Sequence, residues 1–115
     1  MSPTTPDRPP QRGEVWWVAF DPALGGEIRK SRPAVIVSND TANRLLSRVQ
    51  VVPLTSNVSR LYPSEAYVTI MGRQRKAMAD QLTTSSKLRL RERIDTLSPS
   101  DIAAVERAIR VQLGL

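Results

Sequence analysis

The chain has 115 residues, which is enough for one domain that buries roughly two-thirds of its unfolded surface. It contains no cysteine and no histidine, which excludes disulfides, thiolate metal sites and any catalytic triad that uses imidazole. The net charge of +6 favours nucleic acid over a membrane as partner, because Lys and Arg that neutralise phosphates release counterions. With only short apolar runs and no visible signal peptide, a cytoplasmic protein without metal or cofactor is expected.

The first eleven residues form a proline-rich tail with Pro3, Pro6, Pro9 and Pro10 among polar residues. Such a composition cannot bury apolar surface, so residues 1–11 are predicted to be disordered. A single domain is expected to cover residues 12–115.

Short strands are expected along most of the domain, because runs rich in Val, Ile and aromatic residues alternate with Gly, Pro and Asn. The expected strands are residues 14–20, 34–37, 49–54, 67–70, 77–82 and 93–97. Pro53 predicts that the ladder of the third strand ends or bulges there. Trp16 and Trp17 are expected on opposite faces of the first strand, so that one lies in the core. Asn39 is a suitable cap for a short helix that ends by Leu46.

The end of the chain is predicted to be a helix. Ser98 is a good N-cap, Pro99 suits the first helical position, and Asp101 completes a capping-box pattern. An apolar face recurs at helical spacing, and Gly114 is a natural stop. This face consists of Ile102, Val105, Ile109 and Leu113. Short strands with one terminal helix predict a mainly β fold, either an antiparallel barrel or a curled sheet, with the helix packed on it.

Two strand-to-loop segments could carry chemistry. One is the loop before the second strand, where Glu27 lies near Arg29, Lys30 and Arg32. A guanidinium there could bind phosphate oxygens in a planar fork, although a solvated loop is an open alternative. The other segment is the end of the third strand, with Thr55 and Ser56, for which an ordinary hydroxyl turn is the alternative. Strand ends meet in a small barrel, so both segments could face one phosphate.

Several short motifs follow one another in a distinctive order. They are Arg12-Gly13-Glu14-Val15-Trp16, Asp21-Pro22, Gly26-Glu27, Arg32-Pro33-Ala34-Val35, Val37-Ser38-Asn39, Val52-Pro53-Leu54-Thr55 and Ala79-Asp80-Gln81. In this order and spacing the chain resembles the MazF/PemK/Kid family of toxins from toxin–antitoxin modules. The resemblance runs from about Arg12 to Leu115.

The resemblance implies an SH3-like barrel of the MazF/CcdB superfamily with a C-terminal α-helix. It also implies a homodimer that cleaves single-stranded RNA in a sequence-specific, metal-independent reaction and is neutralised by a cognate antitoxin. By match to the family motifs, Arg32 and Thr55 are the catalytic arginine and threonine, and Glu27 is the candidate for removing the 2′-hydroxyl proton. RNA contacts are predicted for Arg29, Lys30, Ser56, Asn57, Asp80 and Gln81, and for the loop expected at residues 72–76.

Asp80 matches an acid used in the Kid branch. That branch has an arginine two residues earlier, where this chain has Met78, so its acid–base pair is incomplete here. Two other functions remain open from the sequence. One is a gyrase poison like CcdB, which shares the fold, and the other is a non-catalytic SH3-like module that binds nucleic acid through charge.

Overall fold

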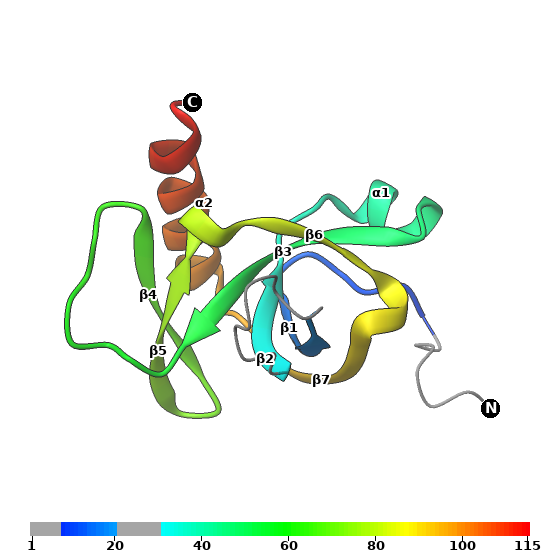
Figure 1. The fold of residues 1–115 in the computed structure, drawn as a ribbon, viewed down its shortest axis with the longest axis horizontal. Helices are drawn as coiled ribbons and strands as arrows, with labels where there is room; N and C mark the ends of the chain where they lie inside the picture. Colours follow the sequence, from blue (N-terminus) through cyan, green and yellow to red (C-terminus); the bar gives the residue numbers. More distant parts are fainter. Residues whose placement is uncertain (1–7, 21–30) are drawn as a thin grey trace, which may run out of the picture.

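The computed structural model describes residues 8–20 and 31–115, and seven antiparallel strands within them form one curled sheet. The strands are β1 (Glu14–Ala19), β2 (Ser31–Ile36), β3 (Arg48–Thr55), β4 (Glu65–Ile70), β5 (Arg73–Met78), β6 (Thr83–Ser86) and β7 (Leu90–Thr96). Their order is β4-β5-β3-β2-β1-β7, and β6 pairs with β3. Figure 1 shows the sheet curling into a half-barrel, with the C-terminal helix standing beside β4 and β5. This arrangement confirms the predicted mainly β fold with a C-terminal helix.

Two α-helices begin where their capping residues predict. Asn39 caps the short helix α1 (Asp40–Leu45), and Ser98 caps α2 (Pro99–Leu113) by accepting from the backbone N–H of Asp101. The Asp101 carboxylate accepts from the N–H of Thr69 on β4 at 2.9 Å. Gly114 ends α2 in the left-handed conformation. Asp101 therefore joins the start of α2 to the sheet.

A tight contact at Gly13 fixes where α2 lies. Gly13 has a φ of +91°, and a Cβ added there would lie 2.7 Å from Cδ1 of Ile102 on α2. The positive φ favours glycine at this position, and a Cβ would also displace the end of the Ile102 side chain. The predicted apolar face of α2 is buried at Val105 and partly buried at Ile102 and Ile109. Leu113 differs from the prediction, since it is 54% exposed one turn beyond the sheet contact.

The core has two parts, one on each side of the central strands β2 and β3. Val35 and Val52 face the part covered by α2, β4 and β5. Ile36 and Val51 face the part enclosed by the curl, together with Trp16 of β1. Burial on both faces explains why β2 and β3 carry continuous apolar runs instead of an alternating pattern.

Several element boundaries differ from the sequence prediction. The fifth strand was expected at residues 77–82, but β5 begins at Arg73 and residues Ala79–Gln81 form the 3₁₀ turn η2. The stretch 72–76, expected as a loop, therefore lies mostly in a strand. The prediction also lacked β6, whose Thr and Ser residues carry no apolar pattern, and the 3₁₀ turn η3 (Lys87–Arg89).

Part of the predicted tail packs on the domain. The side chain of Pro10 is fully buried, and Arg8 donates to the Glu14 carboxylate at 2.7 Å. The same carboxylate accepts from the N–H of Gln11 and from the indole N–H of Trp16. Arg8 and the Gln11 backbone thus both bind the Glu14 side chain of β1.

Candidate active site

A groove of about 880 Å³ opens where the strands of the half-barrel separate. Four segments contribute its walls: the β1–β2 edge, the end of β3, the β4–β5 turn and the middle of β7. Its lining residues are Trp17, Ser31, Arg32, Pro33, Leu54, Thr55, Ser56, Ile70, Met71, Arg73, Arg75, Glu92, Arg93 and Ile94. The groove therefore contains the arginine of the second predicted strand and the two hydroxyls that follow the third.

The ladder between β2 and β3 explains why Arg32 and Thr55 meet. Its pairs are Ile36 with Val51, Val35 with Val52, and Ala34 with Pro53, and there the pairing stops. One step of two residues along each strand from the last pair leads to Arg32 and Thr55. Side chains two residues apart point to the same face of a strand. The two residues thus lie at opposing positions where the strands have separated, and both line the groove.

Proline accounts for the end of this ladder. Pro53 has no N–H to donate. Its partner in β2 is Ala34, and the residue next to Ala34 in that strand is Pro33, which also lacks an N–H. Beyond Pro53, the other edge of β3 pairs with β5 through Leu54 and Thr55. This confirms that the ladder ends at Pro53, as predicted, and shows that the strand continues with a new partner.

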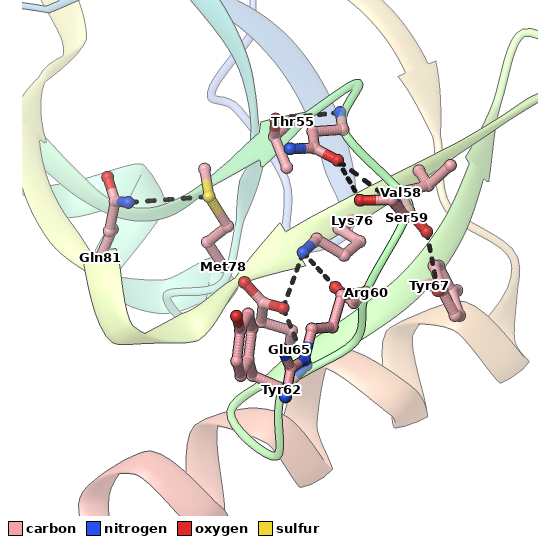
Figure 2. Close-up of polar contacts among 11 residues, drawn as sticks. Thr55, Val58, Ser59, Arg60, Tyr62, Glu65, Tyr67, Lys76, Met78 and Gln81 are labelled. Carbon is pink, nitrogen blue, oxygen red and sulfur yellow. Dashed lines mark hydrogen bonds and ion pairs between the residues drawn. The ribbon is translucent and has the colours of Figure 1, made fainter.

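The Thr55 hydroxyl is held in a turn. Its Oγ1 accepts a hydrogen bond from the N–H of Asn57 at 3.2 Å (Figure 2). The hydroxyl turn that the sequence left open as an alternative is therefore present. It still allows the Thr55 hydroxyl to bind a phosphate in the groove. A threonine hydroxyl that accepts from an amide keeps its own proton for donation. Thr55 is half-buried and Ser56 is exposed, so both hydroxyls border the open groove.

The charge of the groove is strongly positive. Among the described residues, its lining has four arginines, which are Arg32, Arg73, Arg75 and Arg93, and one carboxylate, that of Glu92. Arg73 and Arg75 lie two residues apart on β5, which brings both to the same face. Arg93 of β7 also lines the groove. This set of guanidinium groups suits the phosphates of an extended nucleic-acid strand.

The two adjacent tryptophans have different environments, as predicted. Trp16 is 7% exposed and belongs to the core, whereas Trp17 is 36% exposed and lines the groove. Ile70, Met71 and Ile94 add further apolar surface to the groove. The groove thus combines cations with an aromatic ring, which is the combination that holds phosphates and unstacked bases in single-strand binding proteins.

Other predicted site residues lie elsewhere. Asp80 and Gln81 are exposed in η2, at the opposite end of β5 from Arg73, and neither lines the groove. Gln81 instead donates to the sulfur of Met78 at 3.6 Å. The Asn57 side chain accepts from the N–H and the hydroxyl of Ser59. Glu27, Arg29 and Lys30 lie outside the described residues.

Two further properties concern the described part of the chain. Residues 8–20 and 31–115 hold no group of three or more His, Cys, Asp or Glu side chains that could bind a metal ion. No helix in these same ranges has both the length and the apolar character that a membrane span requires.

The fold and the groove define a small β-barrel protein with a basic, hydroxyl-bordered groove that suits a phosphodiester strand. A model of PemK-like, MazF-like toxins of type II toxin–antitoxin systems matches residues 11–113, and the chain belongs to this family. Family membership confirms the resemblance found in the sequence.

Known proteins resemble the chain in sequence and in fold, as separate comparisons show. The chain is 39% identical over 114 residues to endoribonuclease MazF9 of Mycobacterium tuberculosis, covering 91% of this chain and 97% of that protein. A crystal structure of MazF from Deinococcus radiodurans superimposes with a TM-score of 0.78 at 27% identity, covering 95% and 100%. A mycobacterial endoribonuclease in complex with its cognate antitoxin gives a TM-score of 0.74 at 27% identity, covering 92% and 96%. These likenesses confirm the predicted MazF-type barrel.

Proposed function

We propose that this MazF-like toxin is an endoribonuclease that cleaves single-stranded RNA at specific sequences, without a metal ion, and so inhibits translation and growth in the cytoplasm. One observation carries the proposal. Arg32 and Thr55 occupy opposing positions two residues beyond the last pair of the β2–β3 ladder, and both border a groove rich in arginine. Related proteins at high coverage are named endoribonucleases, which supports the same activity.

RNA supplies its own nucleophile for this reaction. The 2′-hydroxyl attacks the adjacent phosphorus, the P–O5′ bond breaks, and the products carry a 2′,3′-cyclic phosphate and a 5′-hydroxyl. The protein must accept the 2′-hydroxyl proton, deliver a proton to the leaving O5′, and stabilise a transition state with extra negative charge. None of these tasks requires a metal ion.

Arg32 and Thr55 are suited to stabilise the phosphate in the transition state. The Arg32 guanidinium presents several fixed N–H donors to nonbridging oxygens, and the Thr55 hydroxyl can donate one more. Donors that are already positioned in the folded protein need no reorganisation during the reaction, so each contributes strongly. For the base that accepts the 2′-hydroxyl proton, Glu27 is the proposed group on the strength of the family motif.

RNA binding is assigned to the other groove residues. Arg73, Arg75 and Arg93 would bind phosphates on either side of the scissile bond, and the exposed Trp17 ring offers a stacking surface for an unpaired base. Ser56 and Asn57, together with Arg29 and Lys30, remain proposed contacts. Asp80 and Gln81 receive a weaker assignment, because they lie beyond the far end of β5 from the groove arginines.

The proposed partners follow from the family. We infer a homodimer and a cognate antitoxin that covers the groove and blocks RNA. A related endoribonuclease has been solved with its cognate antitoxin, which supports this partner class. The basic groove also favours RNA over the gyrase target of a CcdB-like poison, because the four arginines of its described lining and the hydroxyls of Thr55 and Ser56 suit a phosphodiester.

A cleavage assay tests the proposal. Purified protein is incubated with a mixed pool of single-stranded RNA in excess chelator, and the new 5′ ends are sequenced. We expect 5′-hydroxyl ends that share a short motif, and we expect Arg32→Ala to abolish them while the circular dichroism spectrum is unchanged. Undiminished cleavage by Arg32→Ala would overturn the mechanism. Inhibition of gyrase without any RNA cleavage would overturn the function.

A further inference from the structure

The loop that follows Thr55 has no secondary structure of its own. Residues 56–64 connect β3 to β4 and contain neither helix nor strand. No β ladder holds this loop. Hydrogen bonds from side chains of the neighbouring strands hold it instead. The Tyr67 hydroxyl donates to the backbone oxygen of Val58 at 2.9 Å, and the Lys76 ammonium donates to the backbone oxygen of Arg60 at 2.5 Å (Figure 2).

Lys76 is the centre of this arrangement. Its Nζ lies 2.8 Å from Oε1 of Glu65, and the two side chains are only 7% and 11% exposed. The same Oε1 accepts from the N–H of Tyr62 at 2.9 Å, and the ammonium lies 5.6 Å from the centre of the Tyr62 ring. The ion pair therefore holds the middle of the loop at Arg60 and its end at Tyr62.

The charge state of Glu65 suits this role. Burial alone would raise the pKa of the Glu65 carboxyl, but hydrogen bonds from Lys76 and from the Tyr62 N–H outweigh it and lower the pKa. The carboxylate is thus ionised at neutral pH and can hold the ammonium.

Lys76 also lies directly beside the candidate catalytic threonine. In the ladder between β3 and β5, Thr55 is paired with Lys76. The backbone of Lys76 therefore fixes the start of the loop, while its side chain fixes Arg60 five residues further on. Between these two points lie Ser56 and the Asn57 amide that donates to the Thr55 hydroxyl.

A buried ion pair is a poor way to gain stability. Removing two charges from water is costly, and well-packed apolar residues of similar size often stabilise as much. A buried lysine that binds a loop carbonyl is better explained by the geometry it imposes. Hydroxyls that act on a phosphate must be held within about half an ångström of their productive position, which requires such support.

We propose that Lys76 and Glu65 are positioning residues of the active groove, which fix loop 56–64 so that the Thr55 hydroxyl faces the scissile phosphate. The inference rests on the proposed endoribonuclease function and adds two residues that do not line the groove. Neither residue touches the substrate in this account, since they act through the turn at Thr55.

A double-mutant cycle tests the inference. The variants are Lys76→Met, Thr55→Val and their combination, assayed on one RNA oligonucleotide that contains the cleavage motif. We expect Lys76→Met to lower kcat about 10- to 100-fold with KM within about twofold, because a displaced donor weakens the transition state more than RNA binding. In the Thr55→Val background, Lys76→Met should change kcat by less than about twofold, because the residue it positions is already gone.

The matched control breaks an ion pair away from the groove. Arg12 and Glu106 lie 2.7 Å apart between the start of the domain and α2, and neither lines the groove. Glu106→Gln should leave kcat unchanged in both backgrounds. If Lys76→Met lowered kcat by the same factor with and without the Thr55 hydroxyl, the positioning role would be overturned and a general structural role would remain.

Two further results distinguish failure of the positioning role from failure of the proposed endoribonuclease function. If Lys76→Met does not fold, Glu65→Gln replaces it, and hydrogen exchange at the Asn57 amide is measured as well. Faster exchange at Asn57 together with a lower kcat supports the inference, and unchanged exchange with unchanged kcat overturns it. Absence of RNA cleavage by the unmodified protein, or full activity of Thr55→Val, would instead contradict the proposed function itself.

Discussion

The two ends of β3 contrast in pairing and in burial. Its first half pairs with β6 along one edge, and Val51 to Pro53 pair with β2 along the other. Val49 and Val51 are fully buried there. At the far end β2 has separated, only β5 pairs with Leu54 and Thr55, and Thr55 borders the groove.

This contrast indicates where a small barrel can place a functional site. A residue paired on both edges has its backbone and its side chain committed to the fold. A residue just beyond the last pair keeps the direction that the strand gives it, but its side chain has no partner strand to cover it. Arg32 and Thr55 lie in this position, so β1 and β5 hold their backbones while their side chains remain accessible.

The largest effect is expected from a change at the end of β3 where β2 has separated, which we call the open end. Arg32→Ala should lower the cleavage rate about 10³-fold or more, as removal of an arginine that stabilises a phosphoryl transition state does. The free energy of unfolding should change little, because Arg32 is exposed. Single-turnover cleavage and urea denaturation measure the two quantities. Arg91→Ala, an exposed β7 arginine outside the groove lining, is the matched control and should cleave at the normal rate.

At the other end of β3, where strands pair along both edges (the closed end), we expect a loss of stability without a loss of activity. Ile36 pairs with Val51 and is fully buried, so Ile36→Ala should lower the free energy of unfolding by about 2–5 kcal/mol. Cleavage per folded molecule should stay the same at a temperature where the variant is folded. A large loss of activity without a loss of stability would contradict the division between the two ends.

Local patterns predicted much of this fold. The caps at Asn39 and Ser98 and the alternation of Trp16 and Trp17 depend on residues within one turn or one strand, so the sequence is sufficient for them. The sequence did not predict β6. Thr83 to Ser86 carry no apolar pattern, and they form a strand because they pair with β3. The strand character of residues 73–76 was missed for a similar reason, since alternating cations and polar residues resemble a loop.

The candidate site was predicted in its residues but not in its geometry. Arg32 and Thr55 were identified from the motif order, whereas their opposition depends on a register that only the β2–β3 ladder defines. Arg93 was not assigned to the groove, since its position depends on β7 pairing with β1 through irregular register shifts. The support from Lys76 to Arg60 links residues 16 positions apart through a backbone carbonyl, which leaves no signal in the sequence.

A smaller effect on RNA binding should sharpen the description of the open end. Arg73 is an exposed groove residue on β5, and Arg73→Ala should weaken RNA binding uniformly across sequences. If it contacts one phosphate, the slope of log K against log salt concentration should decrease in magnitude by about 0.7, the value for a single strand. Titrations of an uncleavable RNA at several salt concentrations measure this slope. Arg107→Ala, on the exposed face of α2, should leave it unchanged.

The smallest effect concerns a carboxylate that supports the groove wall. Asp95 of β7 accepts from the N–H of Met71 in the β4–β5 turn and from the N–H of Thr96, both at 2.7 Å. The hydrogen bond from Met71 is the main reason that the pKa of Asp95 is lowered below its usual 3.8; the bond from Thr96 and the nearby charge of Arg93 also lower it, against a smaller opposing effect of burial.

A pH series isolates this contribution. Because the pKa of Asp95 is lower in the folded protein, its carboxylate stabilises the fold above about pH 3.8, and this stabilisation is lost as the pH falls through the folded value. Asp95→Asn should therefore flatten the decrease in the free energy of unfolding as the pH falls through about 3.8 and below, relative to the unmodified protein. Equal pH profiles for Asp95→Asn and the unmodified protein would show that the β4–β5 turn does not depend on this carboxylate. The Met71 side of the groove would then be held by the turn alone.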